Sequence, residues 1–138
     1  MSRKPLAEVS RRSSWLPSGH ERLDLYLVSR QFVSEIYRKT SSYPDAERFG
    51  LTSQTRRAAV SVPANIAEGA ARGSRSEFRR SLLIVRGSLS ELRVLLEIAR
   101  DISYLDESSF QTLMNMVNRL TAMTSGLIHR VKPGISRA

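Results

Sequence analysis

Two stretches of the chain repeat large side chains at spacings that alternate between four and three residues. This spacing places the repeated residues on one side of an α-helix, and an apolar side of that length must be buried against other helices. The first stretch carries Phe78, Leu82, Val85, Leu89, Leu92, Leu96 and Ala99, and the second carries Phe110, Leu113, Val117, Leu120, Thr124, Leu127 and Val131. The sequence therefore predicts two long amphipathic helices.

Two further helices are predicted before these. The first covers about residues 18–37 and the second about residues 52–70, with a loop over residues 39–50 between them. No stretch alternates apolar and polar residues over the length of a β-strand. Four amphipathic helices with short connections predict an all-α fold, an antiparallel four-helix bundle.

Polar residues mark the predicted helix starts. In a capping box, a Ser or Thr before the first turn and a Glu or Gln three residues later each bond a free backbone N–H. Three pairs have this spacing, namely Ser18 with Glu21, Ser74 with Glu77, and Ser108 with Gln111. Gly87 lies in the middle of the third helix, where glycine costs about 1 kcal/mol relative to alanine. We therefore expect another helix or another chain to approach closely at Gly87.

The composition limits the chemistry that this fold can carry. The chain has 138 residues, a formal net charge of +9 and no cysteine, which excludes disulfides, thiolate metal sites and cysteine nucleophiles. This length predicts one domain, with residues 1–19 as a flexible basic leader, 20–132 as the bundle and 133–138 as a short tail. No apolar run is long enough to cross a membrane, and no signal-peptide core is present. We expect a cytoplasmic protein with no membrane partner.

Motifs for metal binding and catalysis are missing from the predicted bundle. Bundles with a di-metal carboxylate centre use a glutamate followed three residues later by a histidine. Here the residues three positions after Glu68, Glu91 and Glu97 are alanine, valine and arginine. The two histidines, His20 and His129, lie near the outer ends of the first and fourth helices. We expect a protein with no catalytic residue, metal or cofactor, and therefore not an enzyme.

A polar stripe runs along the second helix and continues on the third. Its members are Arg57, Asn65 and Glu68, which share one face with Gln54 and Ser61, and Ser88 and Glu91, which interrupt the apolar third helix. Such residues either form a binding site or make a buried, paired network that fixes helix register or assembly. We favour the structural network.

Arginines recur every seven residues along the third helix, at Arg72, Arg79, Arg86, Arg93 and Arg100. From Arg79 onward each directly follows a repeated apolar residue, so the arginines form one row beside the apolar side. Glu97 is placed to neutralise Arg93 and Arg100. The row suits either the phosphates of a nucleic acid or salt bridges to neighbouring helices and subunits. The predicted nucleic-acid-binding set is Arg72, Arg75, Arg79, Arg80, Arg86 and Arg93.

Two segments of the sequence resemble a known protein family. Residues 49–71 read FGLTSQTRRAAVSVPANIAEGAA, and residues 86–92 read RGSLSEL. With Glu77 and Phe78, they resemble the bacterial four-helix-bundle proteins encoded in intervening sequences of some 23S rRNA genes, over roughly residues 24–105. The resemblance implies a cytoplasmic bundle that assembles as a ring-shaped homopentamer. The accessory variability determinants of diversity-generating retroelements look like distant members of this group, and they are basic pentamers that bind nucleic acid and a reverse transcriptase.

Two functions are compatible with these features. In the first, an oligomeric, non-catalytic accessory protein binds RNA or DNA on its basic surface and presents it to the reverse transcriptase of a retroelement. In the second, a scaffold oligomer binds only proteins, and its arginines close the contacts between subunits. We favour the first, because a net charge of +9 per chain attracts polyanions.

Overall fold

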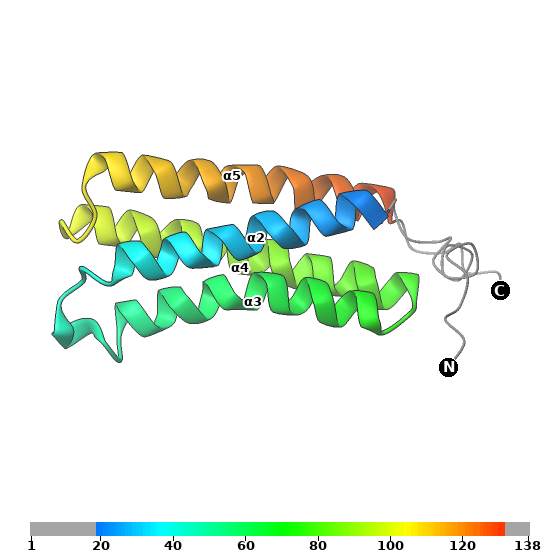
Figure 1. The fold of residues 1–138 in the computed structure, drawn as a ribbon, viewed down its shortest axis with the longest axis horizontal. Helices are drawn as coiled ribbons and strands as arrows, with labels where there is room; N and C mark the ends of the chain where they lie inside the picture. The colour runs from blue at the N-terminus through cyan, green and yellow to red at the C-terminus, as the bar shows by residue number, and fades with distance from the viewer. Residues whose placement is uncertain (1–18, 132–138) are drawn as a thin grey trace, which may run out of the picture.

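The computed structural model describes residues 19–131, and four long helices form most of this range. They are α2 (Gly19–Thr40), α3 (Leu51–Ala71), α4 (Arg75–Asp101) and α5 (Glu107–Arg130), and a short 3-10 helix, η1 (Asp45–Glu47), precedes α3. Consecutive helices run in opposite directions (Figure 1). No strand occurs among the described residues. The predicted all-α four-helix bundle is confirmed.

Each helix packs against two others, so the apolar core lies in the middle of the bundle. Both α2 and α4 contact α3 and α5. All the repeated side chains of α4 and α5 are buried, as their spacing predicts. On the other two helices the core includes Leu25, Phe32 and Ile36 of α2, and Val62 and Ile66 of α3. Burial of one such side chain contributes ~1.5–3 kcal/mol, which makes this shared core the main stabilising element.

A tight turn joins α3 to α4. Gly73 has a φ of +75°, a backbone conformation that glycine adopts without the steric cost of a Cβ. Just after it, the Ser74 hydroxyl oxygen accepts a hydrogen bond from the Glu77 N–H at 3.2 Å, which confirms the predicted cap of α4. The predicted cap at Ser18 lies outside the described residues.

The start of α5 differs from the prediction. The helix begins at Glu107, and its cap is Asp106, whose carboxylate accepts a hydrogen bond from the Ser109 N–H at 2.6 Å. The predicted cap of Ser108 with Gln111 is therefore wrong. A carboxylate makes a stronger, charge-assisted bond to the first-turn N–H groups than a hydroxyl does, and it also favours the positive end of the helix dipole.

A close contact between α3 and α4 occurs at Gly69. A Cβ at this position would lie 2.4 Å from both Cβ and Oγ of the buried Ser81. Gly87, where we predicted such an approach, has no atom within 4 Å of the place that a Cβ would occupy. Within the chain that prediction is wrong, because Gly87 lies on the exposed side of α4.

The connection between α2 and α3 folds over one end of the bundle. Tyr43 is buried, and its ring centroid lies 5.5 Å from that of Tyr104. Glu47 of η1 accepts a hydrogen bond from the Leu51 N–H at 2.9 Å, which fixes the start of α3. Between Glu47 and Leu51 the chain carries Phe49, whose side chain is 90% exposed.

Candidate nucleic-acid interface

The row of arginines on α4 divides into two halves with different surroundings. In the C-terminal half, Arg93 donates a hydrogen bond to the Asn118 side-chain oxygen of α5 at 2.5 Å. The Arg100 guanidinium lies over the Phe110 ring, 4.2 Å from its centroid, and 3.5 Å from the Asp101 carboxylate. These two arginines stabilise the contact between α4 and α5. Arg93, which we placed in the nucleic-acid-binding set, is thus occupied within the chain.

Acidic residues neutralise few of these arginines. Glu97 makes no ion pair within 4.0 Å among residues 19–131, so its predicted pairing with Arg93 and Arg100 is wrong. Arg72 does have a partner, because its guanidinium lies 2.6 Å from the Glu68 carboxylate. This hydrogen bond, followed by the attraction between the two charges, raises the pKa of Arg72.

The arginines at the start of α4 have no such partner. They are Arg75, Arg79, Arg80 and Arg86, which we call the α4 arginine patch. Among the described residues, none of their guanidinium groups makes an ion pair or a hydrogen bond to a side chain. Three are exposed, and the half-buried Arg79 has a buried Nε without a hydrogen-bond acceptor. The patch places four unneutralised charges along about 16 Å of helix.

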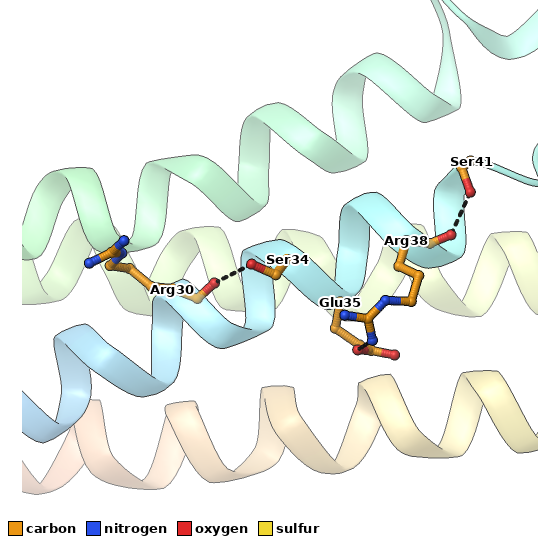
Figure 2. A network of polar contacts seen from close by, with 5 residues as sticks. All are labelled: Arg30, Ser34, Glu35, Arg38 and Ser41. Carbon is orange, nitrogen blue, oxygen red and sulfur yellow. Dashed lines mark hydrogen bonds and ion pairs between the residues drawn. The ribbon is translucent and has the colours of Figure 1, made fainter.

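On α2, by contrast, the exposed Arg38 is neutralised on its own helix. Figure 2 shows Arg38 turned back onto the Glu35 carboxylate, with which it forms an ion pair. The Ser34 and Ser41 hydroxyls donate to the backbone oxygens of Arg30 and Arg38, at 3.3 and 2.6 Å (Figure 2). Because these hydroxyls bond to the backbone, they leave the guanidinium groups of Arg30 and Arg38 untouched.

The α4 arginine patch begins at the end of the bundle where α3 turns into α4. The same end holds the start of α2 and the end of α5 (Figure 1), where Arg130 lies 2.8 Å from Glu21. The chain segments before residue 19 and after residue 131 join the bundle at this end. Their sequence contains one acid, Glu8, and the basic residues Arg3, Lys4, Arg11, Arg12, Lys132 and Arg137. The sequence thus attaches further positive charge to this end.

The polar stripe on α3 and α4 is not the single buried network that we predicted. Ser61 and Ser88 share a hydrogen bond between the helices at 2.8 Å, and the Asn65 amide donates to the Ser61 backbone oxygen at 2.7 Å. The three charged members, Arg57, Glu68 and Glu91, are exposed. They follow the margin of the contact between α3 and α4, where water reaches them, rather than its centre.

Sequence reasoning missed a surface around Phe49. Two hollows of about 560 and 490 Å³ meet there, and Phe49 and Arg57 line both of them. The first hollow extends to Glu91 on α4, and the second extends to Tyr37 and Arg56. We call this region the Phe49 surface. The available signal was the sequence Arg-Phe-Gly at the end of a predicted loop, where an aromatic residue has no helix face to bury it.

The outer side of α4 carries an exposed apolar stripe. Its members are Ile84, Val94, Ile98 and Ile102, each between 42% and 53% exposed. Helical spacing places them together on the side away from the buried row of α4. Several exposed apolar residues on one side of a helix mark contact surfaces more often than single ones do.

The sequence also matches a protein family over most of the bundle. The profile of the family described as "23S rRNA-intervening sequence protein" matches residues 21–126, which includes most of all four helices. The chain belongs to this family. The membership confirms the predicted resemblance, and it places the α4 arginine patch and the Phe49 surface within the family region of the chain.

The bundle of this family member is also similar to a solved structure. That structure is a protein of unknown function from the S23 ribosomal protein family of Bacteroides thetaiotaomicron, with a TM-score of 0.73 and 20% sequence identity. The similarity covers 79% of this chain and 98% of the other. At this identity the likeness concerns the fold. None of the curated proteins compared with the chain matches it.

The part of the chain that the structure describes contains no metal-binding cluster and no membrane-spanning helix. Within residues 19–131, no group of three or more His, Asp or Glu side chains is arranged to hold a metal ion. His20, which lies 3.6 Å from Asp24, is highly exposed. None of the described helices is both long and apolar enough to cross a membrane.

Proposed function

We propose that this member of the 23S rRNA-intervening sequence family is a non-catalytic protein that binds the phosphate backbone of RNA or DNA. The observation that supports the proposal is the α4 arginine patch, whose guanidinium groups have no counter-charge among the described residues. Arginine presents a planar fork of N–H donors that matches phosphate oxygens. The net charge of +9 per chain adds attraction for polyanions at longer range.

The patch predicts a definite dependence of binding on salt. If each of its arginines neutralises one phosphate, log affinity falls with log salt with a slope of about −3.6 for duplex DNA and about −2.8 for a single strand. Raising the salt from about 50 to 200 mM then weakens duplex binding about 150-fold. Contacts with phosphates carry no base information, so the patch alone binds without sequence preference.

The test compares two charge reversals that differ only in place. Arg86→Glu lies in the patch, whereas Arg119→Glu lies on α5, and both arginines are exposed and unpaired among the described residues. Both variants lose the same net charge. We expect Arg86→Glu to weaken binding strongly and to flatten the salt dependence, and Arg119→Glu to have a small effect. Equal effects of the two variants, or no binding by the parent at low salt, would contradict the proposal.

We also propose that the chain forms a homo-oligomer through the α4 apolar stripe, with a second copy as the partner. Copies of a basic chain repel each other, so a contact between them requires a side with few arginines. On the side of the stripe, Arg80 lies one turn before Ile84, and from Gly87 to Ile102 this side carries Glu91 and no arginine. Gly87 leaves room for the backbone of another copy to approach, because nothing within the chain fills its Cβ space. A pentameric ring and a retroelement reverse transcriptase as protein partner are finer proposals, and they rest on the resemblance of residues 49–92.

Light scattering tests the assembly. Ile98→Asp places a charge on the stripe, and Leu23→Asp places one on α2, where Leu23 is 52% exposed. We expect only Ile98→Asp to reduce the mass of the particle. A monomeric parent, or an oligomer that survives Ile98→Asp unchanged, would show that the stripe does not mediate assembly.

A further inference from the structure

We infer that the Phe49 surface stacks an unpaired nucleobase, so that the chain prefers single-stranded RNA or DNA to a duplex. The inference rests on the proposed nucleic-acid binding and deepens it, because the α4 arginine patch by itself recognises only phosphates. Duplex bases are stacked on each other and hide their faces, whereas the bases of a single strand can stack on a protein aromatic ring. Phe49 is the most exposed of the large apolar side chains on the described surface, at 90%.

Two arginines lie near the Phe49 ring. The Arg48 guanidinium lies 5.3 Å from the ring centroid. Arg57 lines both hollows beside Phe49, and it has no hydrogen-bond or ion-pair partner among residues 19–131. A stacking ring flanked by arginines is the arrangement that single-strand binding surfaces use, because the ring takes the base and the arginines take its phosphates.

A second aromatic residue with its own arginine lines the hollow on the side of α2. The Arg56 guanidinium lies 4.5 Å from the centroid of the Tyr37 ring. It also donates hydrogen bonds to the Thr40 hydroxyl at 2.9 Å and to the Tyr37 backbone oxygen at 3.3 Å. These contacts hold Arg56 in place, so a phosphate that meets it does not have to order a free side chain. Tyr37 is itself 44% exposed, which leaves part of it open for contact.

The hollow on the side of α4 suits a base better than a phosphate. Its volume of about 560 Å³ lies in the range of small-ligand sites, ~300–1,000 Å³. Its wall contains Glu91, whose carboxylate accepts a hydrogen bond from the Gln54 amide at 3.4 Å. A carboxylate repels phosphate, but it accepts hydrogen bonds from the N–H groups of bases, such as the ring N3–H of uracil, and the amide offers both donors and an acceptor.

The Phe49 surface and the α4 arginine patch can be tested separately. The Phe49 surface lies beside η1 and the start of α3, at the end of the bundle opposite the turn from α3 to α4 (Figure 1). The length of α3, 21 residues, places Phe49 about 30 Å from that turn, although Arg86, the last arginine of the patch, lies within two helical turns of Glu91 at the edge of the Phe49 surface. A substitution at Phe49 therefore leaves the patch unchanged, and it removes no charge.

The experiment measures binding of labelled oligouridine and of a DNA duplex, by fluorescence anisotropy across a salt series. Phe49→Ala is expected to weaken oligouridine binding about 5- to 150-fold, the effect of losing one stacked base. The slope of log affinity against log salt and the duplex affinity are expected to stay unchanged. Phe49→Trp should keep the parent affinity, and Phe49→Leu should lose it, because leucine retains apolar area without an aromatic face. Leu23→Ala is the control for loss of an exposed apolar side chain elsewhere.

The other outcomes contradict the inference, and they can be distinguished from one another. If the parent binds both probes and Phe49→Ala changes neither affinity, the stacking site is wrong while the proposed function stands. If Phe49→Ala reduces the mass of the particle and weakens both probes together, Phe49 is a contact between copies of the chain. If the parent binds neither probe at low salt, the proposed function and the stacking site both fall. Circular dichroism confirms that each variant is folded.

Discussion

The contact between Gly69 and Ser81 leads to a prediction that a matched pair of variants can test. Gly69 and Gly87 both lie inside helices, but a Cβ at Gly69 would meet Cβ and Oγ of Ser81 at 2.4 Å, whereas one at Gly87 would meet nothing within 4 Å. Replacing each glycine by alanine makes the same chemical change in two different places. The difference in stability between the two variants measures the contact between α3 and α4.

The expected magnitudes follow from two effects of opposite sign. Alanine is favoured over glycine in a helix by up to about 1 kcal/mol, and this gain applies to both variants. Overpacking a well-packed contact costs ~1–3 kcal/mol, and this loss applies only to Gly69→Ala. The upper part of that range is expected, because rotation of the Ser81 side chain moves Oγ but not Cβ. Gly87→Ala should stabilise the fold by about 0.5–1 kcal/mol, and Gly69→Ala should destabilise it by about 1–2 kcal/mol.

Urea denaturation followed by circular dichroism measures both free energies of unfolding. In thermal melts, 1 kcal/mol corresponds to about 3–5 °C in Tm for a chain of this size. The double variant Gly69→Ala with Ser81→Gly removes both atoms that the new methyl group meets. It should recover most of the loss, apart from about 1 kcal/mol for the new helical glycine. A double-mutant cycle over the two positions should therefore show a favourable coupling.

Two results would refute this reasoning. If Gly69→Ala is as stable as Gly87→Ala, α3 and α4 are further apart at this point than the structure shows. If Ser81→Gly fails to rescue Gly69→Ala, the loss comes from somewhere other than Ser81. Gly87→Ala also bears on assembly, because a change in particle mass without loss of fold would place Gly87 in a contact between copies.

Two further predictions concern single ionisable groups. Burial raises the pKa of Tyr43 to about 12, and its hydroxyl has no hydrogen-bond partner within residues 19–131. Tyr43→Phe should therefore keep or raise stability by up to about 1 kcal/mol at neutral pH. In the parent, stability should fall as the pH rises from the unfolded pKa of 10.0 towards about 12, and urea denaturation of Tyr43→Phe should lack this part of the loss. The hydrogen bond from the Ser109 N–H lowers the pKa of Asp106. The ionised carboxylate therefore stabilises the fold at any pH above its pKa in the unfolded chain. This contribution is lost as the pH falls through the lower pKa that Asp106 has in the folded protein. Asp106→Ala should therefore lower the Tm at pH 7 and weaken the decrease of the Tm at acidic pH, whereas Ser108→Ala should change neither. An equal loss of Tm in the two variants would show that Ser108 contributes to the cap.

The fold could be predicted from the sequence because its main signal is local and repeated. Each step of four or three residues along α4 and α5 returns the chain to the same side of the helix, so the spacing alone predicts which side is buried. The capping residue of α5 is harder to predict from the sequence, since Ser108 and Asp106 both precede Phe110 and both residue types are good caps. Only the backbone geometry shows which of the two faces the Ser109 N–H.

The candidate site could be predicted only in part. Helical spacing shows that Arg57, Asn65 and Glu68 share a face, but not whether that face lies at the centre or the margin of a contact. The structure places the charged members of this stripe at the margin, where they are exposed. Phe49 lies in a connection without periodicity, so its exposure depends on how η1 and the start of α3 fold, which the local sequence does not reveal.

The division of the arginine row has a cause that the sequence already contains. Within the bundle, the arginines of α4 can be neutralised by acids of α4 itself, as Asp101 does for Arg100, or by acids on the neighbouring helices α3 and α5. α5 has one acidic residue, Glu107 in its first turn, and α3 has one, Glu68, which is bound to Arg72. Near its C-terminal end, α4 therefore contacts an amide and an aromatic ring of α5. Near its N-terminal end, the carboxylates of Glu68 and Glu77 both lie against Arg72 and not against the α4 arginine patch. Among the described residues no carboxylate pairs with the α4 arginine patch, and the phosphate backbone of a nucleic acid is the counter-charge that we propose for it.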